Sequence, residues 1–395
     1  KLAARLTNWV SLRMTPASEK RIAIIYYNYP PGKSEIGASY LNVPGSIYEI
    51  LLNLRAEGYR TGNISGTAEL LNLMIERGIN IANWAPGELE KLANTPGVIL
   101  WDAEEYLAWF QTLNPIARRY VTEGPTAYIE ELIKLGLSKN VAAETLLKAL
   151  NSWYAEMKDN IRSSEKQIEG LQLLETMYTA LKGIIDGNSS LWNTFQTARN
   201  SFMLLAIPGL CGWGEAPGNI MTVTRNGKKY IVIPGILQGN TFIGPQPQRG
   251  WKADPEMLYS VGILPPHHQY LAYYAWINTV FNASAMIHMG TMGSYEWLPG
   301  KEVMLAEFDF PDIVVDTTPS IYIYRIDNAA DGLAAKRRGL AVIIDHLTPA
   351  MKTSDLYGEL LQLKNLINSY RNSADEQLKN QYLAEIRTVA SRANL

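Results

Sequence analysis

Residues 21–27 read RIAIIYY, an almost wholly apolar run. Such a run, without polar alternation, is typical of a strand that is covered on both faces, as in parallel sheets. A loop follows over residues 28–42, and a helical apolar pattern then runs from Ser46, the expected N-cap, to Glu57 just before Gly58. A strand, a loop and a helix in this order open an α/β layer fold, so we predict an α/β protein with mostly parallel sheets covered by helices.

Outward from this run, the sequence predicts further elements of the same kind. Asn226-Gly227 separates two apolar runs, Ile220–Thr224 and Lys229–Ile233, which is a strong signal of a β-hairpin. Residues 238–251 are dense in Gly, Pro and Gln, and we expect a loop there. The remaining predicted elements are strands at Gly97–Trp101, Ser284–His288, Asp312–Val315 and Leu340–Asp345, and helices at Thr67–Arg77, Gln269–Phe281 and, as a pair, after Thr353.

Residues 126–206 have a different character from the rest of the chain. They carry long helical periodicities that are rich in Leu, Lys and Glu. We predict an inserted bundle of about four helices with a structural or partner-facing role. The expected organisation is therefore an α/β segment at 1–125, the helical insert at 126–206, and an α/β segment at 207–395 that carries the functional site.

Composition and charge exclude several classes of protein. The 395 residues include 36 Lys and Arg against 38 Asp and Glu, a formal charge of -2, which argues against nucleic-acid binding. No run of about 18 apolar residues is present, so we expect no membrane span, and no signal peptide is visible at the start. The single cysteine, Cys211, excludes an internal disulfide and a cysteine-based zinc site. These features predict a cytoplasmic protein.

Aromatic residues are abundant, with 22 Tyr and 10 Trp. A well-buried core explains this composition, and so does a cleft lined by flat side chains for a large planar ligand. Composition alone does not choose between them.

His288 and Glu296 form the first candidate site. His288 ends an apolar strand, and ligands gather at the carboxyl ends of strands in open α/β sheets. Gly290 and Gly293 allow the chain to turn tightly before Glu296, which follows His288 by eight residues. An imidazole and a carboxylate at one mouth can bind a divalent cation or share proton transfer. A histidine satisfied in an ordinary loop explains the same spacing.

Other polar residues lie at similar places in the predicted fold. His346 follows another buried strand, and His268 opens a helix, whose N-terminus favours a neutral imidazole able to bind a metal. Lys336 and Arg337 lie in a basic cluster, and Arg249 lies in the loop GPQPQRGW. These cations either form a solvated surface or pair with carboxylates of a polyacidic ligand.

One tempting motif, PGKS at residues 31–34, is not a phosphate-binding loop. The motif requires a glycine where Tyr27 stands, and Pro30 and Pro31 remove two backbone N–H donors. If ATP drives this protein, another subunit therefore hydrolyses it.

Seven motifs resemble the large subunit of ATP-dependent tetrapyrrole chelatases, the cobaltochelatase and magnesium-chelatase large-subunit family. Their wording is closer to the cobalt branch. The motifs are NYPPGKSEIGASYLNVPGSIYEIL near the start, NWAPGELEKL at 83–92, GWGEAPGNIM at 212–221, GPQPQRGW at 244–251, PPHHQYLAYYAW at 265–276, HMGTMGSYEWLPGKE at 288–302 and AKRRGLAVIIDHLTP at 335–349.

This resemblance implies a function and a set of roles. The family's large subunit binds a metal-free macrocycle and a metal ion, while separate AAA+ ATPase subunits supply energy. We therefore expect insertion of a divalent metal, Co²⁺ first and Ni²⁺ or Mg²⁺ behind it, into a corrinoid precursor. The implied metal ligands are His288, Glu296, His268 and His346, with Glu296 also the acceptor of pyrrole protons. The implied macrocycle-binding residues are Trp251, Arg249, Tyr295, Trp297, Lys301, Lys336 and Arg337.

One departure from the family pattern affects the expected chemistry. Met292 stands where the family has a second histidine, and a thioether suits Cu(I) better than Co²⁺ or Mg²⁺ and accepts no proton. The alternative is therefore a tetrapyrrole carrier that has a degenerate metal site and does not catalyse insertion.

Overall fold

The computed structural model describes residues 1–27, 36, 41–81, 86–162, 166–249, 262–290, 295–324, 329–344, 358–373 and 375–392. They belong to two compact units, residues 1–346 and 347–395, which are described separately.

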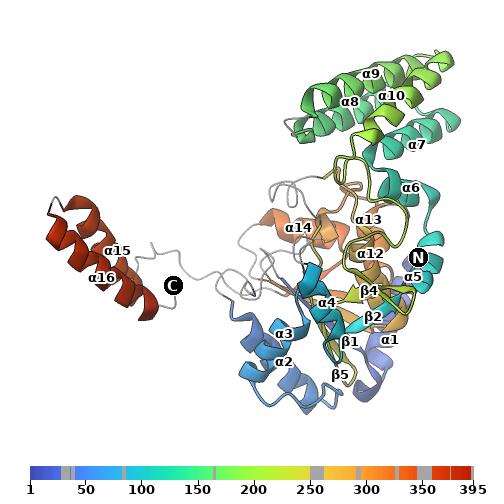
Figure 1. The fold of residues 1–395 in the computed structure, drawn as a ribbon. Coiled ribbons are helices and arrows are strands. Elements are labelled where there is room, and N and C mark those ends of the chain that lie inside the picture. Colours follow the sequence, from blue (N-terminus) through green and yellow to red (C-terminus); the bar gives the residue numbers. More distant parts are fainter. Residues whose placement is uncertain are drawn as a thin grey trace. The chain divides into compact units, whose positions relative to one another are not determined.

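A six-stranded sheet organises the first unit (Figure 1). Its order is β5-β6-β1-β7-β8-β9, and every neighbouring pair is parallel except β5 and β6. This arrangement confirms the predicted α/β class with a mostly parallel sheet. The strands are β1 (Ile22–Tyr26), β5 (Ile236–Gln238), β6 (Thr241–Pro245), β7 (Ala285–Gly290), β8 (Ser320–Tyr324) and β9 (Val342–Ile344).

Both faces of this sheet are buried, as the apolar run of β1 predicts. Side chains that alternate along β1 enter two different hydrophobic clusters, Ala23 and Ile25 on one face and Ile24 and Tyr26 on the other. The face of Ile24 is covered by α2 (Val43–Ala56) and α3 (Thr67–Arg77).

The opposite face of the sheet packs against helix α12 (His268–Ala275), which is buried along its whole length. A π-helical turn, η3 (Trp276–Val280), continues α12. The helix also contacts a second, antiparallel sheet of order β2-β4-β3. The strands of that sheet are β2 (Ile99–Asp102), β3 (Thr222–Arg225) and β4 (Lys228–Ile233). Helix α12 thus forms a layer between the two sheets.

The structure corrects three predictions of local structure. Residues 238–251 are not all loop, because β6 lies within them; there Gly244 lies so close to the Tyr273 hydroxyl that a Cβ would meet it at 2.4 Å. Helix α2 is capped by the Asn42 side chain, which accepts from the Gly45 N–H, and not by Ser46. Asp312–Val315 belongs to helix α13 (Phe310–Val315), because a short apolar run does not distinguish a strand from a helix.

The predicted hairpin, the predicted strands near 97–101, 284–288 and 340–345, and the predicted helices are present. Other elements of the unit complete the layers around the sheets. They are α1 (Leu2–Met14), η1 (Ala17–Glu19), α4 (Pro86–Asn94), α5 (Ala103–Gln111), α6 (Pro115–Glu123), η4 (Tyr295–Trp297) and α14 (Ala329–Arg338).

The helical segment has its own hydrophobic core. Helices α8, α9 and α10 pack side by side, and the core includes Leu150 of α8, Leu174 of α9 and Phe202 of α10 (Figure 1). Four helices and a short turn are found, as predicted. They are α7 (Pro125–Ser138), α8 (Ala143–Asn160), α9 (Gln167–Ile185), η2 (Ser189–Leu191) and α10 (Trp192–Leu204).

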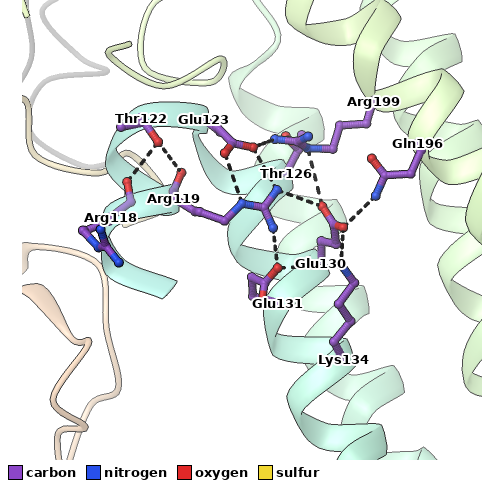
Figure 2. Close-up of polar contacts among 10 residues, drawn as sticks. All are labelled: Arg118, Arg119, Thr122, Glu123, Thr126, Glu130, Glu131, Lys134, Gln196 and Arg199. Atoms are coloured by element: carbon purple, nitrogen blue, oxygen red, sulfur yellow. Dashed lines mark hydrogen bonds and ion pairs between the residues drawn. The ribbon is translucent and has the colours of Figure 1, made fainter. Parts of the chain in front are cut away.

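A network of charged side chains joins α6, α7 and α10 (Figure 2). Glu130 of α7 accepts from Lys134 Nζ at 2.6 Å and from Gln196 Nε2 at 2.6 Å. Arg119 of α6 bonds to Glu123 at 2.8 Å and to Glu130 at 3.3 Å. These bonds join α7 and α10 of the helical segment to α6, the helix that precedes the segment in the chain.

The second unit contains the predicted C-terminal helix pair, α15 (Gly358–Asn372) and α16 (Glu376–Arg392), which pack against each other. Across the described residues of both units, no helix is both long enough and apolar enough to cross a membrane.

Candidate functional site

His288 lies near the carboxyl end of β7, where the sequence predicts it. Its register partners are Ile25 on β1 and Tyr322 on β8, so it lies near the middle of the sheet. Strand alternation points it to the same face as Met286, which is the face that packs on α12. The imidazole is 2% exposed, and burial lowers the pKa of His288 to about 3. The ring is therefore neutral at physiological pH.

Three tyrosines surround this imidazole. The Tyr322 ring stacks on it at a centroid distance of 4.7 Å with 14° between the planes, and the Tyr295 ring lies at 5.0 Å. The Tyr274 ring of α12 lies nearly parallel to it at 6.2 Å. All three tyrosines are buried, and burial raises the pKa of Tyr274 and Tyr295 well above the usual value. The rings of Tyr274, Tyr295 and Tyr322 thus form an aromatic box around His288, and the hydroxyl groups of this box are neutral.

Hydrogen bonds connect this box to the end of β6. His288 Nε2 lies 3.3 Å from the Tyr274 hydroxyl, which donates to Gln246 Oε1 at 2.6 Å. The backbone of Gln246 is held independently, because its N–H donates to the Tyr26 carbonyl at 2.7 Å and its carbonyl accepts from Asn80 Nδ2 at 2.8 Å.

Glu296 is brought into the same box from η4. Its side chain is fully buried, and its Oε2 accepts from the Tyr322 hydroxyl at 2.9 Å. Tyr322 therefore stacks on His288 and hydrogen-bonds Glu296. The adjacent Tyr295 also contacts the His288 ring, and its hydroxyl bonds to Ser320 at 2.9 Å. The predicted imidazole and carboxylate therefore both contact Tyr322, and the His288 ring also contacts Tyr295, the residue before Glu296.

His268 is not brought to this box. Its Nδ1 bonds to the Tyr106 hydroxyl at 2.9 Å, and its Nε2 bonds to the Gly214 carbonyl at 2.9 Å. Burial lowers the pKa of His268 to about 4, so the predicted neutral state is found, but both ring nitrogens are engaged. Its neighbour His267 caps α12 by accepting from the Tyr270 N–H, and it bonds to the Gln248 carbonyl through Nε2. Both histidines hold loops in place.

The predicted macrocycle-binding residues lie in several places. Trp297 is exposed, and its carbonyl accepts from Arg249 at 3.0 Å. Lys301 lines a cavity of about 220 Å³ together with Tyr120 and Tyr128, whose rings stack at 4.4 Å. Two further cations, Lys336 and Arg337, are exposed on α14.

Arg338 was not predicted, although it belongs to the same basic run. It is buried, and it donates to the carbonyls of Leu298, Gly300 at 3.1 Å and Lys301 at 3.0 Å. It therefore fixes the loop that follows Glu296. Trp251, Met292 and His346 lie outside the described residues.

The site offers few metal ligands and several unused polar atoms. Within the described ranges, no three His, Cys, Asp or Glu side chains gather to hold a metal ion. Among the described residues, His288 Nδ1 has no hydrogen-bond partner, and neither do the buried side-chain atoms Asn80 Oδ1, Gln248 Nε2 and both polar atoms of Gln269. Buried polar atoms without partners are uncommon, and they are explained by strain, by a catalytic role or by a bound water or ion.

Sequence reasoning missed Tyr322, Gln246 and Tyr274. A signal for Tyr322 exists in residues 320–324, SIYIY, whose period-two alternation marks a strand. Gln246 and Tyr274 lie in motifs that were recognised, but nothing in their spacing pairs them.

Comparison with known proteins matches the chain to one family. A family model described as CobN/Magnesium Chelatase matches residues 1–129 and 211–395. An uncharacterized protein of Methanocaldococcus jannaschii is 30% identical over 96% of this chain and 23% of its own length. The magnesium-chelatase subunit ChlH of Oryza sativa subsp. indica is 28% identical over the whole chain and 21% of its own length.

A solved structure has the same fold. The catalytic subunit of cobaltochelatase from Mycobacterium tuberculosis superposes with a TM-score of 0.55 at 23% identity, over all of this chain and 25% of that one. This chain thus spans about a fifth to a quarter of the length of the proteins it matches. Because the family model covers most of the chain, the chain belongs to the CobN/magnesium-chelatase family of large chelatase subunits.

Proposed function

We propose that this chain carries the metal-insertion site of a cytoplasmic, ATP-dependent tetrapyrrole chelatase. In this proposal, His288 binds the incoming divalent ion, and Glu296 accepts the two pyrrole protons in turn, passing the first to water before it takes the second. The macrocycle is a metal-free corrinoid precursor. Its flat face lies against Trp297 and Trp251, and its peripheral carboxylates pair with Arg249, Lys301, Lys336 and Arg337.

The observation that supports this proposal best is the shared contact of His288 and Glu296 with Tyr322. Insertion requires a cation and a proton acceptor close to the ring nitrogens, because two pyrrole protons leave as the metal enters. An imidazole and a carboxylate held by one tyrosine satisfy this requirement. Since both side chains are buried, the proposal requires a ring to displace residues that cover this edge of the sheet.

The ligand set favours a metal that is substrate and not a resident ion. A metal that must leave the protein for the macrocycle is held by few ligands, and the described residues offer His288 and Glu296. His346, which lies outside the described residues, is an additional candidate by its sequence position. A neutral imidazole suits Co²⁺ or Ni²⁺ better than Mg²⁺, which prefers oxygen ligands. We therefore propose Co²⁺ as the substrate. ATP is hydrolysed by AAA+ partner subunits in this proposal.

Replacing Glu296 with Gln tests the assignment. The amide keeps the size of the side chain and still accepts from Tyr322, but it does not take up a proton. We expect metal insertion to be abolished, with binding of the free-base macrocycle nearly unchanged. Absorption spectra of a free-base corrinoid or porphyrin, recorded with the ATPase subunits and Co²⁺, Ni²⁺ or Mg²⁺, measure both quantities.

The matched control is Glu302→Gln, which neutralises an 89% exposed carboxylate six residues further along the same loop and is expected to insert metal normally. Unchanged turnover in Glu296→Gln would refute the role of Glu296. Ring binding without metal uptake by the unaltered chain, even with all subunits present, would instead support a carrier with a degenerate metal site at Met292.

A further inference from the structure

We propose that Gln246, acting through Tyr274, fixes the tautomer of His288 so that its Nδ1 presents a lone pair to the metal ion. This inference rests on the proposed function for the identity of the ligand, but the hydrogen-bond geometry that carries it is independent of any metal. It makes Gln246 and Tyr274 positioning residues.

The hydrogen-bond partners of the Gln246 side chain show which of its two amide atoms is the oxygen. One polar atom of this amide lies 3.4 Å from the Pro247 carbonyl, which is only an acceptor, and 3.2 Å from the Tyr270 hydroxyl. The atom that faces the carbonyl must be the amide nitrogen, because two oxygens do not hydrogen-bond without a proton. The other atom, which faces Tyr274, is therefore the amide oxygen.

The amide oxygen of Gln246 in turn decides where the proton of the Tyr274 hydroxyl points. An amide oxygen has no proton to give, so at 2.6 Å the hydroxyl donates to Gln246 Oε1. A tyrosine hydroxyl carries one proton. Facing His288, the Tyr274 oxygen is consequently an acceptor.

The Tyr274 oxygen then decides which ring nitrogen of His288 carries the proton. Its Nε2 lies 3.3 Å from the Tyr274 oxygen and must carry the proton that makes this contact a hydrogen bond. A neutral imidazole has one ring proton, so Nδ1 carries a lone pair. In the described structure, this Nδ1 has no partner. A metal ion binds an imidazole only through an unprotonated nitrogen, and the partner of the opposite nitrogen decides which one that is.

The decisive variant is Gln246→Leu. It removes the acceptor, so the Tyr274 hydroxyl is expected to turn and donate to His288 Nε2, which moves the ring proton to Nδ1. The loop itself remains anchored, because the bonds of Gln246 to Tyr26 and Asn80 use its backbone. Tyr270→Phe is the matched control, since it deletes a hydroxyl one turn earlier on α12 that contacts the amide nitrogen and not the oxygen.

The tautomer is read by ¹⁵N spectra of the full chain, prepared with ring-labelled histidine and without metal. The chain has four histidines, and the signals of His288 are those that His288→Gln removes. We expect a protonated Nε2 in the unaltered chain and in Tyr270→Phe, and a protonated Nδ1 in Gln246→Leu. Co²⁺, added alone and followed through the loss of the His288 signals, is expected to bind Gln246→Leu about 10- to 100-fold more weakly.

Tyr274→Phe tests whether the reversed tautomer requires the Tyr274 hydroxyl or follows from any damage to the aromatic box. This variant has no hydroxyl that could donate to Nε2, so the protonated Nδ1 expected for Gln246→Leu should not appear in it. A protonated Nδ1 in the unaltered chain, the same tautomer in Gln246→Leu, or unchanged Co²⁺ binding after a reversal would each overturn the proposal. If all these results are as expected and the complete complex still inserts no metal, the proposed function fails while the assignment of the tautomer stands.

Discussion

Two buried polar clusters of this molecule differ in how completely their polar atoms are hydrogen-bonded. One is the charged network that joins α6, α7 and α10, and the other is the aromatic box around His288. In the first, Glu130 is 3% exposed on its side chain and accepts from Lys134, Gln196 and Arg119. Burial opposes its ionisation, but the hydrogen bond from Lys134 and the nearby arginines hold the pKa of Glu130 below its usual value. Both carboxylate oxygens of Glu130 have a cationic or amide partner.

The aromatic box around His288 carries neutral tyrosine hydroxyls and no cation among the described residues, and one of its polar atoms has no partner. Burial lowers the pKa of His288. One ring nitrogen bonds to Tyr274, and the other has no partner within the described structure. A cluster that serves the fold compensates its charges, whereas a cluster that leaves a polar atom unused is suited to bind something.

Removing Glu130 should give the largest effect on stability. Glu130→Leu leaves the charges of Arg119 and the buried Arg199 incompletely paired, and loss of one member of a buried pair costs about 3–5 kcal/mol. Urea unfolding followed by circular dichroism measures this loss. Lys134→Met, at the exposed end of the same network, is the control and should cost less than about 1 kcal/mol. Equal losses in the two variants would mean that the network is not the source of the stability.

Removing His288 should, in contrast, change stability at neutral pH by less than about 1 kcal/mol, since His288→Leu leaves no donor unsatisfied. The Tyr274 hydroxyl keeps its acceptor, Gln246. Unfolding at pH 7.5 tests this expectation, and a loss as large as that of Glu130→Leu would contradict the distinction between the two clusters.

The same variant should alter the response to acid. The pKa values of His267, His268 and His288 are lowered to about 3, 4 and 3 in the fold, from 6.5. The unfolded chain therefore binds protons below pH 6.5 that the folded chain does not bind. This contribution to stability is complete above pH 6.5 and is lost as the pH falls, toward about 4 for His268 and about 3 for His267 and His288. Each histidine contributes a slope of about 1.4 kcal/mol per pH unit between these limits. His288→Leu should reduce the total slope by that amount, and an unchanged slope would show that His288 titrates normally in the fold.

The smallest effect on stability is expected at the exposed end of the basic run on α14. Lys336→Ala and Arg337→Ala should each change the free energy of unfolding by less than about 0.5 kcal/mol, because neither side chain is buried. If they pair with macrocycle carboxylates, binding of a polycarboxylic free-base ring should weaken at low salt and less so at high salt. Arg338→Met is the matched control, because that guanidinium is buried on three loop carbonyls and its loss should destabilise the fold. Ring affinity that is unchanged at low salt would remove Lys336 and Arg337 from the binding surface.

Local pattern determined a large part of this molecule. The apolar run of β1, the strand that ends at His288, the helices of the 126–206 segment and the family motifs were all readable, because periodicity and turn residues act within a few positions along the chain. The candidate pair of His288 and Glu296 was also readable, since it lies within one short stretch. Strand β6 was not, because Gly244 and Pro245 resemble loop residues until α12 is known to pack on them.

Only the tertiary structure decided what surrounds the pair. Parallel pairing joins strands distant in sequence, so β1 lies between β6 and β7 although more than two hundred residues separate it from each. That order brings Gln246 to Tyr274, and it sets Tyr322 in register with His288. Which nitrogen of an imidazole holds a proton depends on such distant neighbours, and no local pattern in the chain contains that information.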